Sequence, residues 1–152
     1  MNELPEVKRL VLEHDIIAAC KEFFGPYENV KEYVTEVKEY LTQAHIPSKP
    51  FHAFGIYFDD HRTKKPEELR SFQGVILEKE TQVEPPYFIY QMKQGKEYLY
   101  TKVVGDAMIV PGYMALFNHM GLQKIKAGAS GGHQVVTMED GKVVFEIYLE
   151  ID

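Results

Sequence analysis

The chain has 152 residues, of which 45% are hydrophobic and 26% are charged, so it is long enough for one ordinary domain or for two small modules that share a core. These fractions are near globular averages and exclude a disordered tail or a fibrous repeat. No apolar run approaches the roughly 18–20 residues that a membrane span needs. The formal charge of −6 argues against nucleic-acid binding, which requires clustered Lys and Arg. We therefore expect neither a nucleic-acid nor a membrane partner.

The N-terminal residues have neither the basic start nor the apolar stretch of a signal peptide, and the single Cys20 cannot form an internal disulfide. Both features favour a cytoplasmic protein. The chain has 10 Tyr and 9 Phe but no Trp. Two interpretations of this composition stay open: the rings fill a small core, or some of them line a surface that binds something.

A shift of about 80 residues aligns the sequence on itself almost without gaps, placing Gly25 on Gly105 and Tyr33 on Tyr113. Each half is expected to contain two strands, the shared glycine, a helix and two further strands. The eight predicted strands are residues 7–12, 16–24, 55–58, 71–77, 87–92, 97–104, 134–138 and 143–151. Because strands that are neighbours in sequence are mostly antiparallel, the predicted class is α+β, with the two copies joined about a pseudo-twofold axis and the helices on one face.

The first helix is predicted because apolar residues recur at helical spacing. These residues are Val30, Tyr33, Val34, Val37 and Leu41. The second helix is expected to have Pro111 in its first turn and Gly121 as its C-cap. An Asp140-Gly141 pair between two alternating runs predicts a tight hairpin. The stretches 84–86 and 128–132 are expected to be linkers.

Most of the common site patterns are weak in this sequence. The six histidines lack metal-ligand spacing, so we expect scattered surface histidines, no metal site and no cofactor. They are His14, His45, His52, His61, His119 and His133. The loops at Gly25 and Gly105 each offer only one glycine for a phosphate. Cys20 lies on an apolar strand and is expected to be a buried thiol.

The C-terminal strand gives the sharpest signal for a binding site. With a period of two, one face is apolar and is expected to lie under the helices; it consists of Val143, Phe145, Ile147, Leu149 and Ile151. The opposite face presents Glu146 and Tyr148, roughly 7 Å apart. A carboxylate beside aromatic hydroxyls on a concave surface suits a flat, cationic, apolar guest. The alternative is a solvated outer face without a function.

Further ligand-binding candidates are aromatic residues on strands expected to border the same groove, or near the helix starts. They are Phe54, Tyr57, Tyr98, Tyr100, Tyr27 and Tyr113. Alternation along a strand does not settle which of these rings face the groove. No catalytic residue is assigned.

The run G-I-Y-F-D-D-H-R at 55–62, followed by P-E-E-L-R-S-F-Q-G-V at 66–75, resembles the signature of GyrI-like small-molecule-binding domains. The resemblance covers nearly the whole chain. It implies a single domain over 1–152, a tandem repeat of β-α-β-β modules at 5–80 and 85–152, with a ligand groove at the pseudo-twofold axis. The fold is similar to that of effector-binding domains of bacterial multidrug regulators and of SOUL haem-binding proteins. The family's E-x-Y-L string usually lies on the penultimate strand, whereas here Glu146-Ile147-Tyr148-Leu149 lies on the last.

The resemblance implies a standalone binder of hydrophobic, cationic small molecules, for drug or toxin sequestration or sensing, because the two units occupy all 152 residues. One alternative is a hydrolase of cyclopropane-bearing genotoxins, with Glu146 as general base. Another is a protein-interaction module, such as a gyrase modulator, that uses the excursion at 59–70. The physiological ligand and the formation of a homodimer are left open.

Overall fold

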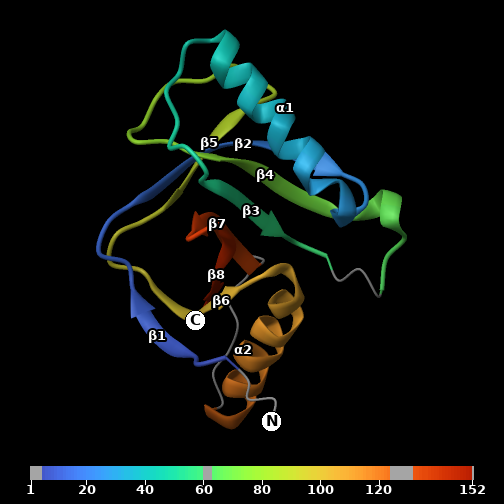
Figure 1. Ribbon diagram of the computed structural model, residues 1–152, viewed down its shortest axis with the longest axis vertical. Helices are drawn as coiled ribbons and strands as arrows, with labels where there is room; N and C mark the ends of the chain where they lie inside the picture. The colour runs from blue at the N-terminus through green and yellow to red at the C-terminus, as the bar shows by residue number, and fades with distance from the viewer. Residues whose placement is uncertain (1–4, 60–62, 124–131, 152) are drawn as a thin grey trace.

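The computed structural model describes residues 5–59, 63–123 and 132–151. The described strands are β1 (Lys8–Val11), β2 (Ile16–Phe24), β3 (Ala53–Tyr57), β4 (Arg70–Ile76), β5 (Phe88–Met92), β6 (Glu97–Val104), β7 (Gly132–Glu139) and β8 (Lys142–Glu150). The α-helices are α1 (Val30–Gln43) and α2 (Ile109–Gln123), and short 3-10 helices occupy Tyr27–Asn29, Pro66–Glu68 and Asp106–Met108. Figure 1 shows the two helices at opposite ends of the molecule, with the strands curled between them.

All eight strands form one antiparallel sheet in the order β1-β6-β8-β7-β3-β4-β2-β5. In the repeat, β1 to β4 correspond to β5 to β8. When these counterparts are exchanged and the order is read from the other end, it is unchanged. The centre of this symmetry lies between β3 and β7, where Phe54 pairs with Val135 and Gly55 pairs with Gln134. The predicted α+β class with a pseudo-twofold arrangement is therefore confirmed.

The first strand of each half pairs with the other half, which the sequence did not indicate. β1 pairs with β6 rather than with β2, and β5 pairs with β2 rather than with β6. The two connections meet where Leu12 N–H donates to the carbonyl of Lys96 at 3.0 Å and Gly95 N–H donates to the carbonyl of Leu12 at 2.9 Å. Each half thus completes the sheet of the other.

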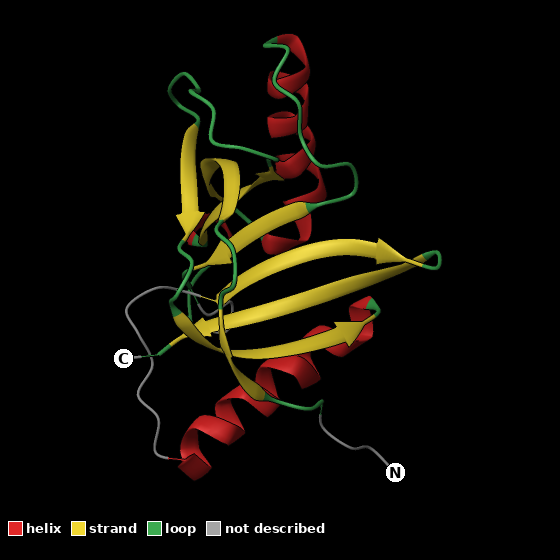
Figure 2. Ribbon diagram, turned by 90° about the vertical axis from the view of Figure 1, so that its left-hand side faces the viewer, coloured by secondary structure: helices red, strands yellow, loops and turns green. Residues whose placement is uncertain are grey.

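The helices cover one face of the sheet, as predicted. On α1, Val37 and Leu41 are buried against Phe23 and Val75. On α2, Leu116 and Met120 pack in the same way against Leu99, Ile147 and Leu149 of β6 and β8. Figure 2 shows these helices beside the strands that they cover. Neither helix is long and apolar enough to cross a membrane, as judged over the described residues.

Most predictions for turns and helix ends are confirmed, and two are wrong. Asp140 and Gly141 have φ of 51° and 76°, as a two-residue hairpin turn requires, and Pro111 lies in the first turn of α2. Gly121 does not cap α2, which continues to Gln123, and it lacks the positive φ that a glycine C-cap adopts. Gly132 belongs to β7 rather than to a linker; residues 128–131 lie outside the described part.

The face of the sheet turned away from the helices is called the inner face below. It carries a large apolar cluster in which residues of both halves meet, including Phe54, Ile56, Tyr98 and Tyr148. Cys20 is fully buried in this cluster, as predicted, and burial raises the pKa of its thiol. The inner face is therefore mostly filled by side chains.

Candidate functional site

Glu146 and the tyrosines of β6 and β8 form a hydrogen-bonded group on the inner face. Tyr100 pairs directly with Tyr148 across the two strands, and both rings belong to the inner-face cluster. The Tyr100 hydroxyl donates to Oε2 of Glu146 at 2.7 Å, and the Tyr148 hydroxyl makes a longer contact of 3.4 Å with the same oxygen. The sequence therefore placed Glu146 and Tyr148 on the correct face, and the register adds Tyr100 as the closest donor.

The electrostatics of this group keep both phenols protonated. Burial, followed by the neighbouring Glu146 carboxylate, raises the pKa of Tyr100 and of Tyr148 above the ordinary value of 10. Both hydroxyls therefore remain donors at neutral pH. Within the described residues, both contacts go to Oε2 of the half-buried Glu146. Its other carboxylate oxygen accepts no hydrogen bond from the described residues.

A histidine and a tyrosine that were not predicted as site residues meet on the same face. His133 lies on β7, directly opposite Tyr148, and is fully buried. Its Nε2 lies 2.8 Å from the hydroxyl of Tyr90. The expectation of surface histidines is wrong for His133, because the alternation that buries Val135 on β7 also places His133 on the inner face.

Five of the eight predicted ligand-binding residues share the inner face: Glu146, Tyr148, Tyr100, Tyr98 and Phe54. Phe54 is 1% exposed and Tyr98 is 3% exposed. Burial raises the pKa of Tyr98 to about 12. These two rings are almost fully buried, whereas the half-buried Tyr100 and Glu146 are accessible to solvent.

The other three predicted residues lie on the helix side of the sheet. Tyr57 alternates with Ile56, which is part of the inner-face cluster, and its ring meets that of Tyr27 edge-on at 4.9 Å. Tyr113, on α2, accepts a hydrogen bond from Nε2 of Gln134 at 2.8 Å. Burial raises the pKa of Tyr57 to about 12 and raises that of Tyr113 as well. The sheet separates all three from Glu146, so they do not border the predicted groove.

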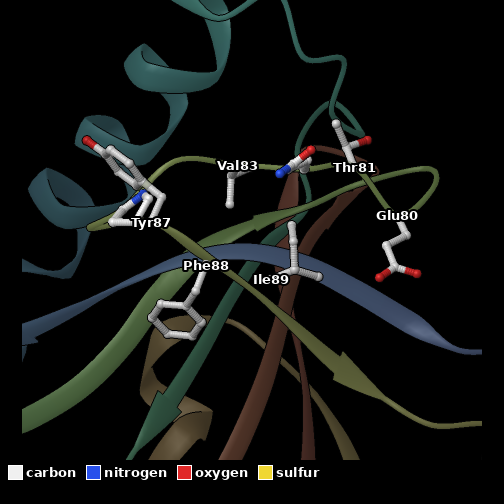
Figure 3. A pocket seen from close by; sticks show the side chains of 8 residues that line it. Glu80, Thr81, Val83, Tyr87, Phe88 and Ile89 are labelled. Atoms are coloured by element: carbon white, nitrogen blue, oxygen red, sulfur yellow. The ribbon is translucent and has the colours of Figure 1, made fainter.

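Two surface hollows lie beside β5, at the opposite edge of the sheet from β6 and β8. One, of about 410 Å³, lies beside β5 and is lined by residues 80–83, 85 and 87–89. Figure 3 shows Tyr87 and Ile89 on the side of β5 that faces this hollow and α1, with Phe88 pointing the opposite way. The other, of about 480 Å³, is lined by Lys21, Glu22, Phe72, Pro86 and Phe88. The sequence singled out neither, since their linings come from strands and loops that only the sheet brings together.

No protein-family model and no curated protein matches the chain. Among solved structures, the EcmrR C-terminal domain is similar with a TM-score of 0.70 at 11% identity, covering 97% of this chain and 96% of that one. EcmrR in a complex with DNA gives a TM-score of 0.71 at 11% identity, and there the match covers 97% of this chain but only 56% of EcmrR.

Two further structures share the arrangement. A hydrolase from Listeria innocua has a TM-score of 0.63 at 7% identity, covering 98% of this chain and 93% of that one. An integron cassette protein from the mobile metagenome of Vibrio cholerae has a TM-score of 0.60 at 6% identity, covering 99% and 97%. At such identities the likeness concerns the fold. The chain thus has the fold of the EcmrR C-terminal domain, in agreement with the tandem architecture that its resemblance to GyrI-like domains implied.

Proposed function

We propose that this protein binds hydrophobic, cationic small molecules on the inner face of its sheet, with Glu146 as the counter-ion. The observation that carries the proposal is the pair of phenols, Tyr100 and Tyr148, directed at one oxygen of Glu146. They hold a carboxylate in place among aromatic rings. Such a group attracts a cation both through its charge and through the ring faces, and partial burial strengthens each attraction.

The surroundings of Glu146 support a binding role over a purely structural one. A half-buried carboxylate is costly unless it is paired, and in the described part of the chain no Lys or Arg forms an ion pair with Glu146. Lys102, directly opposite Glu146, pairs instead with Glu139 at 3.2 Å, and Lys8 has its Nζ 5.4 Å from the ring centroid of Tyr100. The protein thus already places one ammonium on this ring. A cationic guest would approach the same ring and complete the ion pair.

The test is fluorescence polarisation with the cationic dye rhodamine 6G and with anionic fluorescein as the probe of opposite charge. Glu146→Gln keeps the shape of the side chain and is expected to weaken rhodamine binding by about tenfold or more, the equivalent of one ion pair. Glu97→Gln is the matched control, because Glu97 alternates with the inner-face Tyr98 and is an exposed partner of Arg9 at 2.9 Å. Unchanged rhodamine affinity in both Glu146→Gln and Tyr148→Ala would overturn the proposal.

Hydrolysis is the second candidate function, favoured by one observation: a structure that shares this fold at 7% identity is described as a hydrolase. Glu146 would accept a proton from water as the water attacks a strained cyclopropane carbon. The ring bond breaks, and its electron pair passes to a conjugated carbonyl, which takes up a proton. A ring-opened product that forms with the protein but not with Glu146→Gln would establish this activity. Buffer-level turnover would exclude it and leave the binding proposal standing.

A further inference from the structure

The hollow lined by Lys21, Glu22, Phe72, Pro86 and Phe88, here called the Phe72 hollow, has an aromatic wall. Phe72 on β4 contacts Phe58 edge-on with a centroid distance of 4.7 Å and contacts Phe88 on β5 at 4.8 Å. Glu22 on β2 pairs directly with Phe72. The hollow therefore combines two lining rings, Phe72 and Phe88, with one carboxylate, and Phe58 packs against Phe72 beside it. Its volume of about 480 Å³ falls within the range usual for small-molecule sites.

The protein's own Arg70 already makes the contacts that such a wall offers. The guanidinium carbon of Arg70 lies 4.4 Å from the ring centroid of Phe58 and 5.2 Å from that of Phe72. Its Nε donates to Oε2 of Glu22. A planar cation thus lies on aromatic rings while a carboxylate balances its charge, which is the geometry expected for cation–π recognition. The Arg70 and Glu22 side chains are 42% and 39% exposed, so solvent and a guest can reach the pair.

This location is separate from Glu146. Phe72 on β4 pairs with Glu22 on β2, and Glu146 on β8 pairs with Lys102 on β6. Phe72 and Glu146 therefore occupy corresponding positions in the two halves. The first half thus presents an aromatic ring where the second presents the carboxylate. Three strand steps, from β8 through β7 and β3 to β4, separate the two positions. They correspond to roughly 14 Å along the sheet.

We propose that the Phe72 hollow is a second binding site, for planar aromatic cations, and that Arg70 is an internal plug that the guest displaces from Glu22. The proposal does not depend on a role for Glu146. Exchanging one exposed ion pair for another costs little, because such pairs contribute weakly in water. The guest gains the ring contacts of Phe72 and Phe88, which Arg70 only partly uses.

The charges that line the hollow favour a cation over an anion. Glu22 lines it directly, and the ring faces repel anions. Lys21 is the other charged lining residue, but its ammonium is paired with Glu36 of α1 at 2.5 Å. Phe24, which is 62% exposed, pairs with Arg70 across β2 and β4 and follows Glu22 on the same face of β2.

The experiment titrates the full chain with proflavine, a planar aromatic cation, and follows the quenching of dye fluorescence. Glu146→Gln is the background, so that only the Phe72 hollow is measured. Adding Arg70→Gln is expected to tighten proflavine binding by about threefold, because the plug is removed. Adding Glu22→Gln is expected to weaken binding by about fivefold or more, because the charge partner is lost.

Controls and contrary outcomes separate this site from the Glu146 site. Lys102→Gln removes an exposed ion pair with Glu139 at the far end of the sheet and is expected to leave proflavine binding unchanged. Phe88→Leu keeps much of the side-chain volume and is expected to weaken binding; far-UV circular dichroism checks its fold. Loss of all proflavine binding in Glu146→Gln alone overturns the second site. So does a weaker affinity in Arg70→Gln, an unchanged affinity in Glu22→Gln, or preferential binding of fluorescein.

Discussion

Tyr100 reaches Glu146 diagonally across two neighbouring strands. The residue directly opposite Tyr100 is Tyr148, and the residue directly opposite Glu146 is Lys102, yet the Tyr100 hydroxyl and Oε2 of Glu146 are 2.7 Å apart. Because the side chains on one face of paired strands lie within reach of their diagonal neighbours, this contact ties β6 to β8 as well as positioning the carboxylate. One hydrogen bond thus contributes both to the sheet and to the proposed site.

Tyr100→Phe keeps the ring and removes this donor. We expect the free energy of unfolding to fall by about 1–2 kcal/mol, the usual contribution of a hydrogen bond to a charged group that is partly exposed. Tyr148→Phe is the matched variant and is expected to lose less, because its hydroxyl is 3.4 Å from the same oxygen. Urea denaturation measures both losses. Equal losses in the two variants would contradict the assignment of Tyr100 as the main partner.

The buried tyrosines make the protein sensitive to alkali. The pKa of Tyr57 and of Tyr98 rises to about 12 from 10, so between these values the unfolded chain loses protons that the folded chain keeps. Deprotonation then favours the unfolded state. We expect the contribution of these tyrosines to the free energy of unfolding to be constant below about pH 9. It is expected to fall as the pH rises from about 10 to 12.

Urea midpoints measured between pH 8 and 12 test this dependence. Absorbance at 295 nm, which reports phenolate, is the second readout, because the buried tyrosines should ionise together with unfolding rather than before it. A flat stability profile up to pH 12 would show that these phenols ionise equally easily in both states. Tyr98→Phe should reduce the slope above pH 10, since it removes one of the groups responsible.

Alanine substitutions at Gly74 in the sheet and at Gly121 in α2 are expected to change the stability of the protein in opposite directions. A Cβ on Gly74 would lie 1.9 Å from the backbone carbonyl oxygen of Ala19, so strands β2 and β4 would have to separate. We expect Gly74→Ala to cost more than about 3 kcal/mol. A Cβ on Gly121 meets nothing within 4 Å, and Gly121→Ala is expected to stabilise α2 by about 0.5–1 kcal/mol.

Thermal unfolding of both variants gives the comparison. A higher midpoint for Gly121→Ala also tests the correction that α2 continues through this residue to Gln123, because an alanine at a glycine C-cap would lower the midpoint instead. A Gly74→Ala protein with an unchanged midpoint would mean that β2 and β4 are not so closely paired there.

Local rules allowed the sequence to determine the elements and their faces. Helical spacing located α1, and alternation along β8 assigned Ile147 to the helix side and Tyr148 to the inner face. The Asp140-Gly141 turn could be predicted because it depends on the backbone preferences of two adjacent residues. Alternation failed for Tyr57 because it gives the two faces of a strand without saying which one the helices cover.

Only the tertiary structure decided which strands are neighbours, and therefore which distant side chains meet. Alternation gives a strand two faces but no partner, so the pairing of β1 with β6 and of β5 with β2 was not foreseeable. The diagonal contact of Tyr100 with Glu146, the burial of His133 beside Tyr90, and the Arg70–Glu22 pair over Phe72 all follow from that strand order. Each joins residues more than 40 positions apart. Such contacts depend on packing, and a local sequence pattern does not specify them.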